Sequence, residues 1–119
     1  MTDFPVVQII VAALVVGVYV LTRIRKQRRR ALLSAKIQAG AKIVDVRSSS
    51  EYAAGHYDAA INIPVDKLPS KLKGLGPRDT AIIVYCASGM RAANAQRILQ
   101  DAGFTDVLNA GGISAMPLK

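Results

Sequence analysis

Apolar and polar residues divide the chain into one long apolar block near its start and a longer stretch of short alternating runs. From Phe4 to Leu21 no residue is charged. As a helix this block would extend about 27 Å, at about 1.5 Å per residue, which is close to the roughly 30 Å hydrocarbon core of a bilayer. The pattern therefore predicts one transmembrane helix over residues 4–22.

Shorter apolar runs after the long block alternate with segments of helical spacing. Residues 43–46 and 81–85 are rich in β-branched side chains, as expected for strands that are buried on both faces of a parallel sheet. Over residues 91–103, small and apolar residues recur every three or four positions, which predicts a helix closed by a glycine. Residues 106–109 form the last predicted strand. We therefore expect an α/β domain over residues 31–119, with a small parallel sheet and helices on both faces.

The distribution of charge predicts the orientation of the transmembrane helix. The formal net charge is +8, and the segment 23–30 supplies six of the sixteen basic residues, whereas Asp3 is the single acidic residue before position 31. A cleaved signal peptide would carry its basic residues before the apolar block, so a permanent anchor is the better interpretation. The positive-inside rule then predicts that the N-terminus lies outside and the domain lies in the cytoplasm, with a bacterial inner membrane as the expected location.

The basic juxtamembrane segment, residues 23–30, has an alternative role in nucleic-acid binding, as short basic runs sometimes do. We favour the topological role, because orientation and attraction to anionic headgroups of the lipid bilayer already explain a basic cluster beside a membrane span. No nucleic-acid partner is therefore expected. For residues 4–22, a buried core helix and a cleaved signal remain the alternatives.

The sequence contains a single cysteine, Cys86, directly after the predicted strand 81–85. A lone cysteine excludes an internal disulfide framework and a thiolate metal cluster, and it indicates a reducing compartment. The loop after Cys86 can point backbone N–H groups at one anion, which here would be the sulfur. Together with a cation from Arg91, these groups would lower the thiol pKa. The alternative is a buried structural cysteine.

Three motifs of the sequence, in their order along the chain, resemble those of the rhodanese (thiosulfate sulfurtransferase) family, in its single-domain, membrane-anchored form. The stretch Cys86-Ala-Ser-Gly-Met-Arg91 resembles the active-site loop of that family. Upstream, the family's second signature is resembled by Val44-Asp-Val-Arg47, Glu51-Tyr52, Gly55-His56 and Ala60-Ile-Asn-Ile-Pro64. Downstream, its C-terminal signature is resembled by Gly103-Phe104 and Asn109-Ala-Gly-Gly-Ile113. The resemblance extends from about Leu33 to Met116.

The resemblance implies a sulfurtransferase that moves a sulfane sulfur through a persulfide on Cys86, the catalytic nucleophile. The substrate-binding residues would be Ala87, Ser88, Gly89, Met90 and Arg91. The donor would be thiosulfate or a persulfide. The acceptor would be an external thiol or cyanide, because no second cysteine is present to resolve the persulfide. No cofactor and no metal are implied.

Other matching residues are implied to be structural, namely Asp45, Arg47, Glu51 and His56. Arg47 is suited to an ion pair with Glu51, and the residues 48–51 offer a capping box for a short helix. His56 belongs to the scaffold in this resemblance, although a lone histidine also invites assignment as a general base. The chain departs from the family at positions 57 and 59, and it lacks the tryptophan usual near position 116, so we expect a shortened final helix.

Two rival functions remain open at this point. A cysteine phosphatase or arsenate reductase also uses a loop from cysteine to arginine to bind an oxyanion, but those phosphatases have five residues between the two, whereas four separate Cys86 from Arg91. A non-catalytic docking module on a membrane is the other rival, because a fold does not guarantee activity. The presence of the cysteine favours the enzyme.

Overall fold

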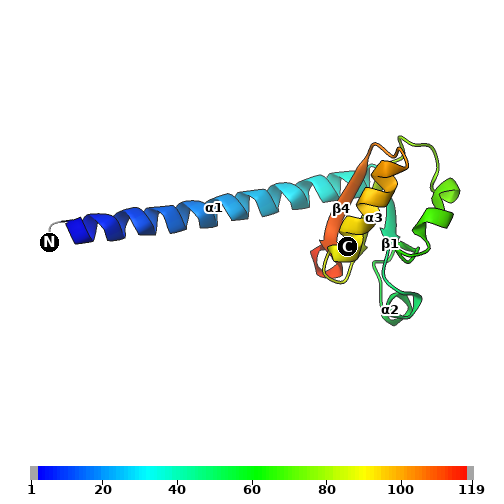
Figure 1. Ribbon diagram of the computed structural model, residues 1–119, viewed down its shortest axis with the longest axis horizontal. Helices are drawn as coiled ribbons and strands as arrows, with labels where there is room; N and C mark the ends of the chain where they lie inside the picture. Colours follow the sequence, from blue (N-terminus) through cyan, green and yellow to red (C-terminus); the bar gives the residue numbers. More distant parts are fainter. Residues whose placement is uncertain (1–2, 118–119) are drawn as a thin grey trace. The chain divides into compact units, whose positions relative to one another are not determined.

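The computed structural model describes residues 3–117 (Figure 1). The chain divides into two compact units between residues 31 and 32, and the helix α1 (Asp3–Gln38) runs through this division. The helix continues without a break through the basic segment 23–30, since Arg, Lys, Gln and Ala are good helix formers. The predicted limits at residues 22 and 30 are therefore not ends of secondary structure.

The apolar part of α1 has the length and composition of a membrane-crossing helix, and it is the only such helix among residues 3–117. Its large apolar side chains are exposed, including Phe4, Leu14 and Leu21. A helix of this kind near an N-terminus occurs both in membrane anchors and in signal sequences. The transmembrane assignment and its orientation therefore stay predictions.

Four parallel strands form the sheet of the second unit, in the order β2-β1-β3-β4. They are β1 (Lys42–Asp45), β2 (Ile61–Asn62), β3 (Ile82–Cys86) and β4 (Val107–Gly112). The helices after α1 are α2 (Ser49–Ala54) and α3 (Met90–Asp101), and single turns of 3-10 helix are η1 (Leu68–Ser70), η2 (Leu72–Leu75) and η3 (Ile113–Ala115). This arrangement confirms the predicted α/β fold.

Alternate residues of β3 pack into two cores, one on each face of the sheet. All five residues of the strand are buried, which explains why its sequence is apolar throughout. Val84 and Cys86 face the core that α3 covers. Ile83 and Tyr85 face the opposite core, to which the last turns of α1 contribute Leu33. Helices thus cover both faces, as predicted.

The last strand is longer than predicted, because β4 continues to Gly112 instead of ending at residue 109. A bulge at Ala110 permits this: Val84 pairs with Asn109, but the next residue of β3 pairs with residue 111. In the described residues after β4, the chain forms η3, and Met116 is 7% exposed. Residues 118–119 lie outside the described part of the chain, so the shortened final helix stays a prediction.

Candidate active site at the carboxyl ends of the strands

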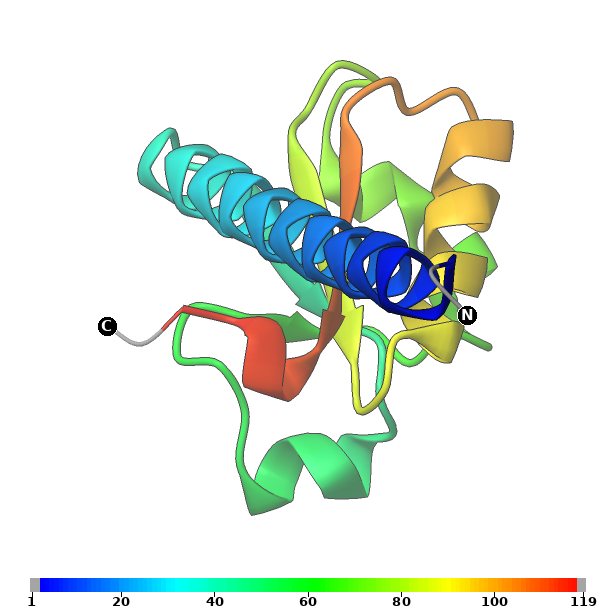
Figure 2. The same ribbon diagram turned by 90° about the vertical axis from the view of Figure 1, so that its left-hand side faces the viewer.

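The connections that follow β1 and β3 leave the sheet in opposite directions. The two strands are neighbours, but the chain passes from β1 to β2 on one side and from β3 to β4 on the other. Ligands of open parallel sheets bind at the carboxyl ends of the strands, where the strand order reverses in this way. At this point residues 46–51 follow β1, and residues 86–91 follow β3. We call residues 86–91 the cysteine loop. Figure 2 shows α2 and the cysteine loop at the same end of the sheet.

Cys86 ends β3, and backbone N–H groups surround its sulfur. The N–H of Gly89 donates to Cys86 Sγ at 2.9 Å, and the N–H of Ala92 donates at 3.4 Å. The φ of Gly89 is 104°, a left-handed conformation that glycine adopts without strain. Cys86 has no exposed surface, whereas Ser88 and Met90 are exposed. The loop therefore presents its backbone to the sulfur and these two side chains to solvent.

The surroundings of Cys86 favour its thiolate form. Burial raises the pKa of the thiol, but four backbone N–H groups outweigh burial, and the pKa lies below its ordinary value. The four groups belong to Ala92, Gly89, Ser88 and Arg91. Hydrogen bonds from N–H groups stabilise a negative sulfur more than a neutral one. The main stabilisation of the thiolate thus comes from backbone amides.

Arg91, the last residue of the cysteine loop, forms a bidentate ion pair with Glu51. Its Nη1 lies 2.6 Å from Oε1 of Glu51, and its Nη2 lies 3.0 Å from Oε2. The hydrogen bond with Glu51 is the main cause that raises the pKa of Arg91, and the Cys86 thiolate makes a smaller contribution. Glu51 therefore holds the guanidinium close enough to Cys86 for the two charges to interact.

The predicted ion pair between Arg47 and Glu51 is wrong, because Arg47 binds Asp45 instead. The Nε of Arg47 lies 3.0 Å from each Asp45 carboxylate oxygen, and its Nη2 lies 2.7 Å from Oδ2. The same Nη2 donates to the carbonyl oxygen of Gly55 at 2.6 Å. Asp45 is fully buried at the end of β1, and a buried carboxylate requires a nearby cation. Arg47 supplies it by folding back over the end of the strand.

Glu51 has a second function in its own helix. The Oγ of Ser48 accepts the N–H of Glu51 at 3.2 Å, and Glu51 Oε1 accepts the N–H of Ser48 at 3.3 Å, which confirms the predicted capping box. The hydrogen bond from Arg91 is the main cause that lowers the pKa of Glu51 to about 2, and Ser48 adds to it. The carboxylate is therefore ionised near neutral pH.

His56 is exposed and is held by residues of the α2 region. Its Nδ1 lies 2.9 Å from the carbonyl oxygen of Tyr52, and its ring stacks on the Tyr52 ring with the centroids 3.6 Å apart. These contacts attach His56 to α2, and its structural role stays a prediction. Among residues 3–117, no group of three or more His, Cys, Asp or Glu side chains is placed to hold a metal ion.

The end of β4 packs against the cysteine loop, backbone against backbone. A Cβ on Gly112 would lie 2.5 Å from the carbonyl oxygen of Ala87, closer than real Cβ atoms approach. Gly111 has a φ of 89°, but Gly112 has a φ of −87°, which any residue adopts. The sequence pattern predicts special backbone angles for both glycines, and this is right only for Gly111. Gly112 is required by the close approach instead.

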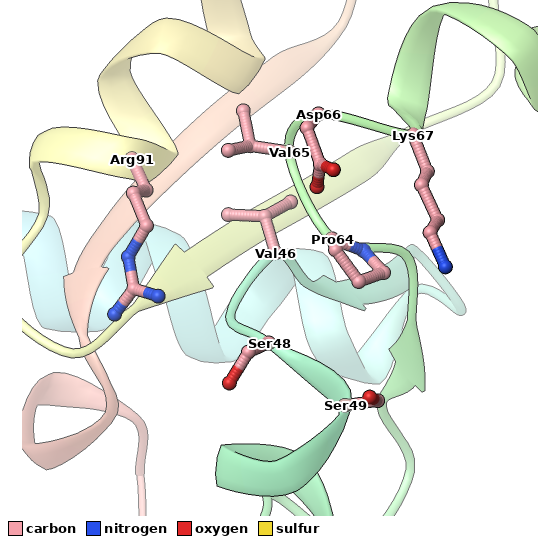
Figure 3. Close-up of a pocket in the computed structure, with 8 residues that line it drawn as sticks. All are labelled: Val46, Ser48, Ser49, Pro64, Val65, Asp66, Lys67 and Arg91. Carbon is pink, nitrogen blue, oxygen red and sulfur yellow. The ribbon is translucent and has the colours of Figure 1, made fainter.

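A cavity of about 270 Å³ lies beside Arg91 at the same end of the sheet (Figure 3). It is lined by Val46, Ser48, Ser49, Pro64, Val65, Asp66, Lys67 and Arg91. Sequence reasoning missed this cavity, because its walls come from three segments that follow three different strands. The available signal was topological: segments that follow parallel strands meet at one edge of the sheet.

The fold and the cysteine loop define the class of protein. The family model of the rhodanese-like domain matches residues 30–116, and the chain belongs to this family. The match covers the whole of the parallel sheet, α2, α3 and the last turns of α1. The family resemblance of the sequence motifs is thereby confirmed.

Two of the similar proteins carry sulfurtransferase names. Thiosulfate sulfurtransferase PspE of Escherichia coli strain K12 is 36% identical over 77 residues, which cover 62% of this chain and 74% of PspE. Putative sulfurtransferase YtwF of Bacillus subtilis strain 168 is 34% identical over 92 residues, covering 76% of this chain and 88% of YtwF. A solved structure of rhodanese with anions from E. coli matches with a TM-score of 0.64 at 30% identity, covering 67% of this chain and 95% of that chain.

Proposed function

We propose that this chain transfers a sulfane sulfur from thiosulfate or a persulfide donor through a persulfide on Cys86. One observation carries the proposal: the N–H groups of Gly89 and Ala92 donate to Cys86 Sγ at 2.9 and 3.4 Å. These groups stabilise the thiolate before the reaction, and they are placed to stabilise a negative persulfide after it. The sulfurtransferase names of PspE and YtwF support the same reaction class.

In the first half-reaction, the Cys86 thiolate attacks the outer sulfur of thiosulfate. A new S–S bond forms at Cys86, the S–S bond of thiosulfate breaks, and sulfite leaves with the electron pair. Arg91 binds the negative oxygens of the donor, since a guanidinium matches such groups in charge and geometry. Because Cys86 has no exposed surface, the cysteine loop must widen when the donor approaches.

In the second half-reaction, an external thiolate or cyanide attacks the outer sulfur of the persulfide. The bond between that sulfur and Cys86 breaks, and the electron pair returns to Cys86 as a thiolate. The acceptor comes from outside because the chain contains no second cysteine. Neither step requires a metal or an organic cofactor.

Cys86→Ser tests the covalent mechanism, because serine is similar in size but cannot form a persulfide. The unchanged chain should gain one sulfur atom on Cys86 by mass spectrometry after thiosulfate treatment, with sulfite released before any cyanide is added. Cyanide should then yield thiocyanate, and a folded Cys86→Ser chain should do neither. Thiocyanate at the wild-type rate from the variant would eliminate the mechanism. A folded but inactive wild type would favour a docking module.

We infer further that α1 is a single-pass membrane anchor over residues 4–22, followed by the basic segment 23–30 and the rhodanese-like domain 31–119. The uncharged, exposed surface of the first part of α1 supports a location in a lipid bilayer. By the positive-inside rule, the basic residues that follow favour a cytoplasmic location of the domain. A reporter fused to the C-terminus should be cytoplasmic, and deletion of residues 1–22 should release the domain. Recovery of the reporter on the opposite face would overturn the orientation.

A further inference from the structure

We propose that the cavity beside Arg91 binds the acceptor of the second half-reaction, and that this acceptor is a small thiol carrying both a carboxylate and an ammonium group. This inference rests on the proposed sulfur transfer and adds the class of its second substrate. We call the cavity the acceptor pocket. Its wall consists of Val46, Ser48, Ser49, Pro64, Val65, Asp66, Lys67 and Arg91.

The acceptor pocket shares one residue, Arg91, with the loop that begins at Cys86. It lies at the carboxyl ends of β1, β2 and β3, where the strand order reverses and ligands of such sheets bind. Arg91 belongs both to the pocket wall and to the cysteine loop. Val46, on the same wall, packs in one buried cluster with Cys86. A ligand in the pocket therefore lies beside the segment that carries the sulfur.

The size of the acceptor pocket limits the ligand. Its volume is about 270 Å³, whereas pockets for drug-sized ligands range from about 300 to 1,000 Å³. Val46, Pro64 and Val65 supply an apolar part of the wall, against which a short carbon chain can pack. A molecule the size of a free amino acid fits this description better than a peptide does.

The charges of the acceptor pocket select the ligand class. Asp66 and Lys67 are exposed, and neither side-chain charge has a hydrogen bond or ion pair with another residue of the described part of the chain. The charge of Arg91 is matched by Glu51. Figure 3 shows Arg91 and Lys67 on opposite sides of the pocket, with Asp66 between them.

The pocket thus offers one unmatched anion and one unmatched cation. Asp66 would repel a ligand that carries only negative charge, and Lys67 would repel one that carries only positive charge. A thiol with both a carboxylate and an ammonium group satisfies both residues at once. Recognition of this kind separates the acceptor from thiosulfate, which is an anion only.

The reaction balances without any further reagent. The negative Cys86 persulfide takes up one proton from water, and the thiolate of the bound acceptor then attacks its outer sulfur, so that a new S–S bond forms between them. The bond between Cys86 Sγ and the outer sulfur breaks, and its electron pair stays on Cys86 as a thiolate. The proton of the persulfide leaves with the transferred sulfur, so the product is the hydropersulfide of the acceptor.

The test uses the full chain in detergent, with Cys86 loaded as the persulfide by thiosulfate and the loss of the added sulfur followed by mass spectrometry. The acceptors are L-cysteine, 3-mercaptopropionate, which lacks the ammonium group, and cysteamine, which lacks the carboxylate. They are compared at equal thiolate concentration. L-cysteine should discharge the persulfide fastest.

Variants then assign each charge to its residue. Asp66→Asn should slow L-cysteine and cysteamine relative to 3-mercaptopropionate by about fivefold, the upper range for one exposed ion pair. Lys67→Gln should slow L-cysteine and 3-mercaptopropionate relative to cysteamine by a similar factor. The matched controls are Asp79→Asn and Lys71→Gln, exposed residues outside the pocket wall that should leave all rates unchanged.

The outcomes separate this inference from the sulfur transfer on which it rests. The inference is overturned if each variant slows discharge by all three acceptors equally, or if neither variant changes any rate. In both cases the pocket does not distinguish the acceptors by charge. If only Lys67→Gln has an effect, the pocket binds a plain anion and the zwitterionic class is wrong. If the unchanged chain never loads a persulfide, the sulfur transfer itself fails.

Discussion

Two arginine–carboxylate pairs at the carboxyl ends of neighbouring strands differ in burial. In the Asp45–Arg47 pair the side chains are 0% and 9% exposed, and in the Glu51–Arg91 pair they are 35% and 38% exposed. The buried pair joins residues of one segment and fixes the end of β1. The half-exposed pair joins α2 to the cysteine loop, 40 residues away in the sequence. We therefore assign one pair to the scaffold, and under the proposed function the other pair opens to admit a substrate anion.

Breaking the buried pair should have the largest effect, and it should be an effect on stability. Arg47→Met leaves Asp45 buried without its cation, a change that costs about 3–5 kcal/mol of folding free energy. Urea unfolding of the full chain in detergent, followed by circular dichroism, measures this loss. The double variant Asp45→Asn/Arg47→Met removes both charges and should recover part of it. Equal stability of Arg47→Met and the wild type would show that the pair is not a scaffold element.

Breaking the half-exposed pair should change function more than stability. Arg91→Ala should raise the KM for thiosulfate by about tenfold, the size of one charge-assisted hydrogen bond, and should raise the pH at which Cys86 reacts with an alkylating agent. Part of the lowered thiol pKa should survive, because backbone amides cause most of it. Arg97→Ala is the control, since Arg97 is exposed on α3 and bonds to Asn94. If neither the KM nor the pH dependence of alkylation changes, Arg91 does not belong to the site.

The smallest effect is expected at Glu51, as a pH dependence of stability. Its pKa in the folded chain is about 2, below the ordinary value of 4.5. A lowered pKa stabilises the fold fully above the ordinary value, and this contribution is lost as the pH falls from about 4.5 to about 2. The stability difference between the wild type and Glu51→Gln should therefore shrink through that window and vanish at its lower end. A difference that stays constant with pH would mean that ionised Glu51 does not hold Arg91.

Local patterns were sufficient to predict the cysteine loop, because its parts are adjacent in sequence. The buried run of β3 and the helical spacing of α3 place Cys86 and Arg91 at the two ends of one turn. The partners of Arg47 and Glu51 were not predictable in this way. Spacings of two and of four residues both suit an ion pair, and only the fold brings Arg91 to Glu51.

The acceptor pocket and the bulge of β4 could not be predicted from the sequence for the same reason. The pocket combines segments after three strands, and the bulge at Ala110 depends on the pairing of β3 with β4. Neither leaves a periodic signal in the sequence. Glycine pairs such as Gly111-Gly112 do mark a place where the backbone is special, but the sequence does not separate a left-handed angle from a close approach.

The close approach of Gly112 to Ala87 limits how this domain can vary in evolution. Any side chain at position 112 would bring its Cβ too close to the carbonyl oxygen of Ala87, the residue after the cysteine. A collection of random variants selected for loss of sulfur transfer should therefore include position 112 about as often as position 86. The two positions lie in different strands and share no chemistry. Position 112 is therefore restricted to glycine, whereas the exposed side chains at positions 88 and 90 can change without disturbing this backbone contact.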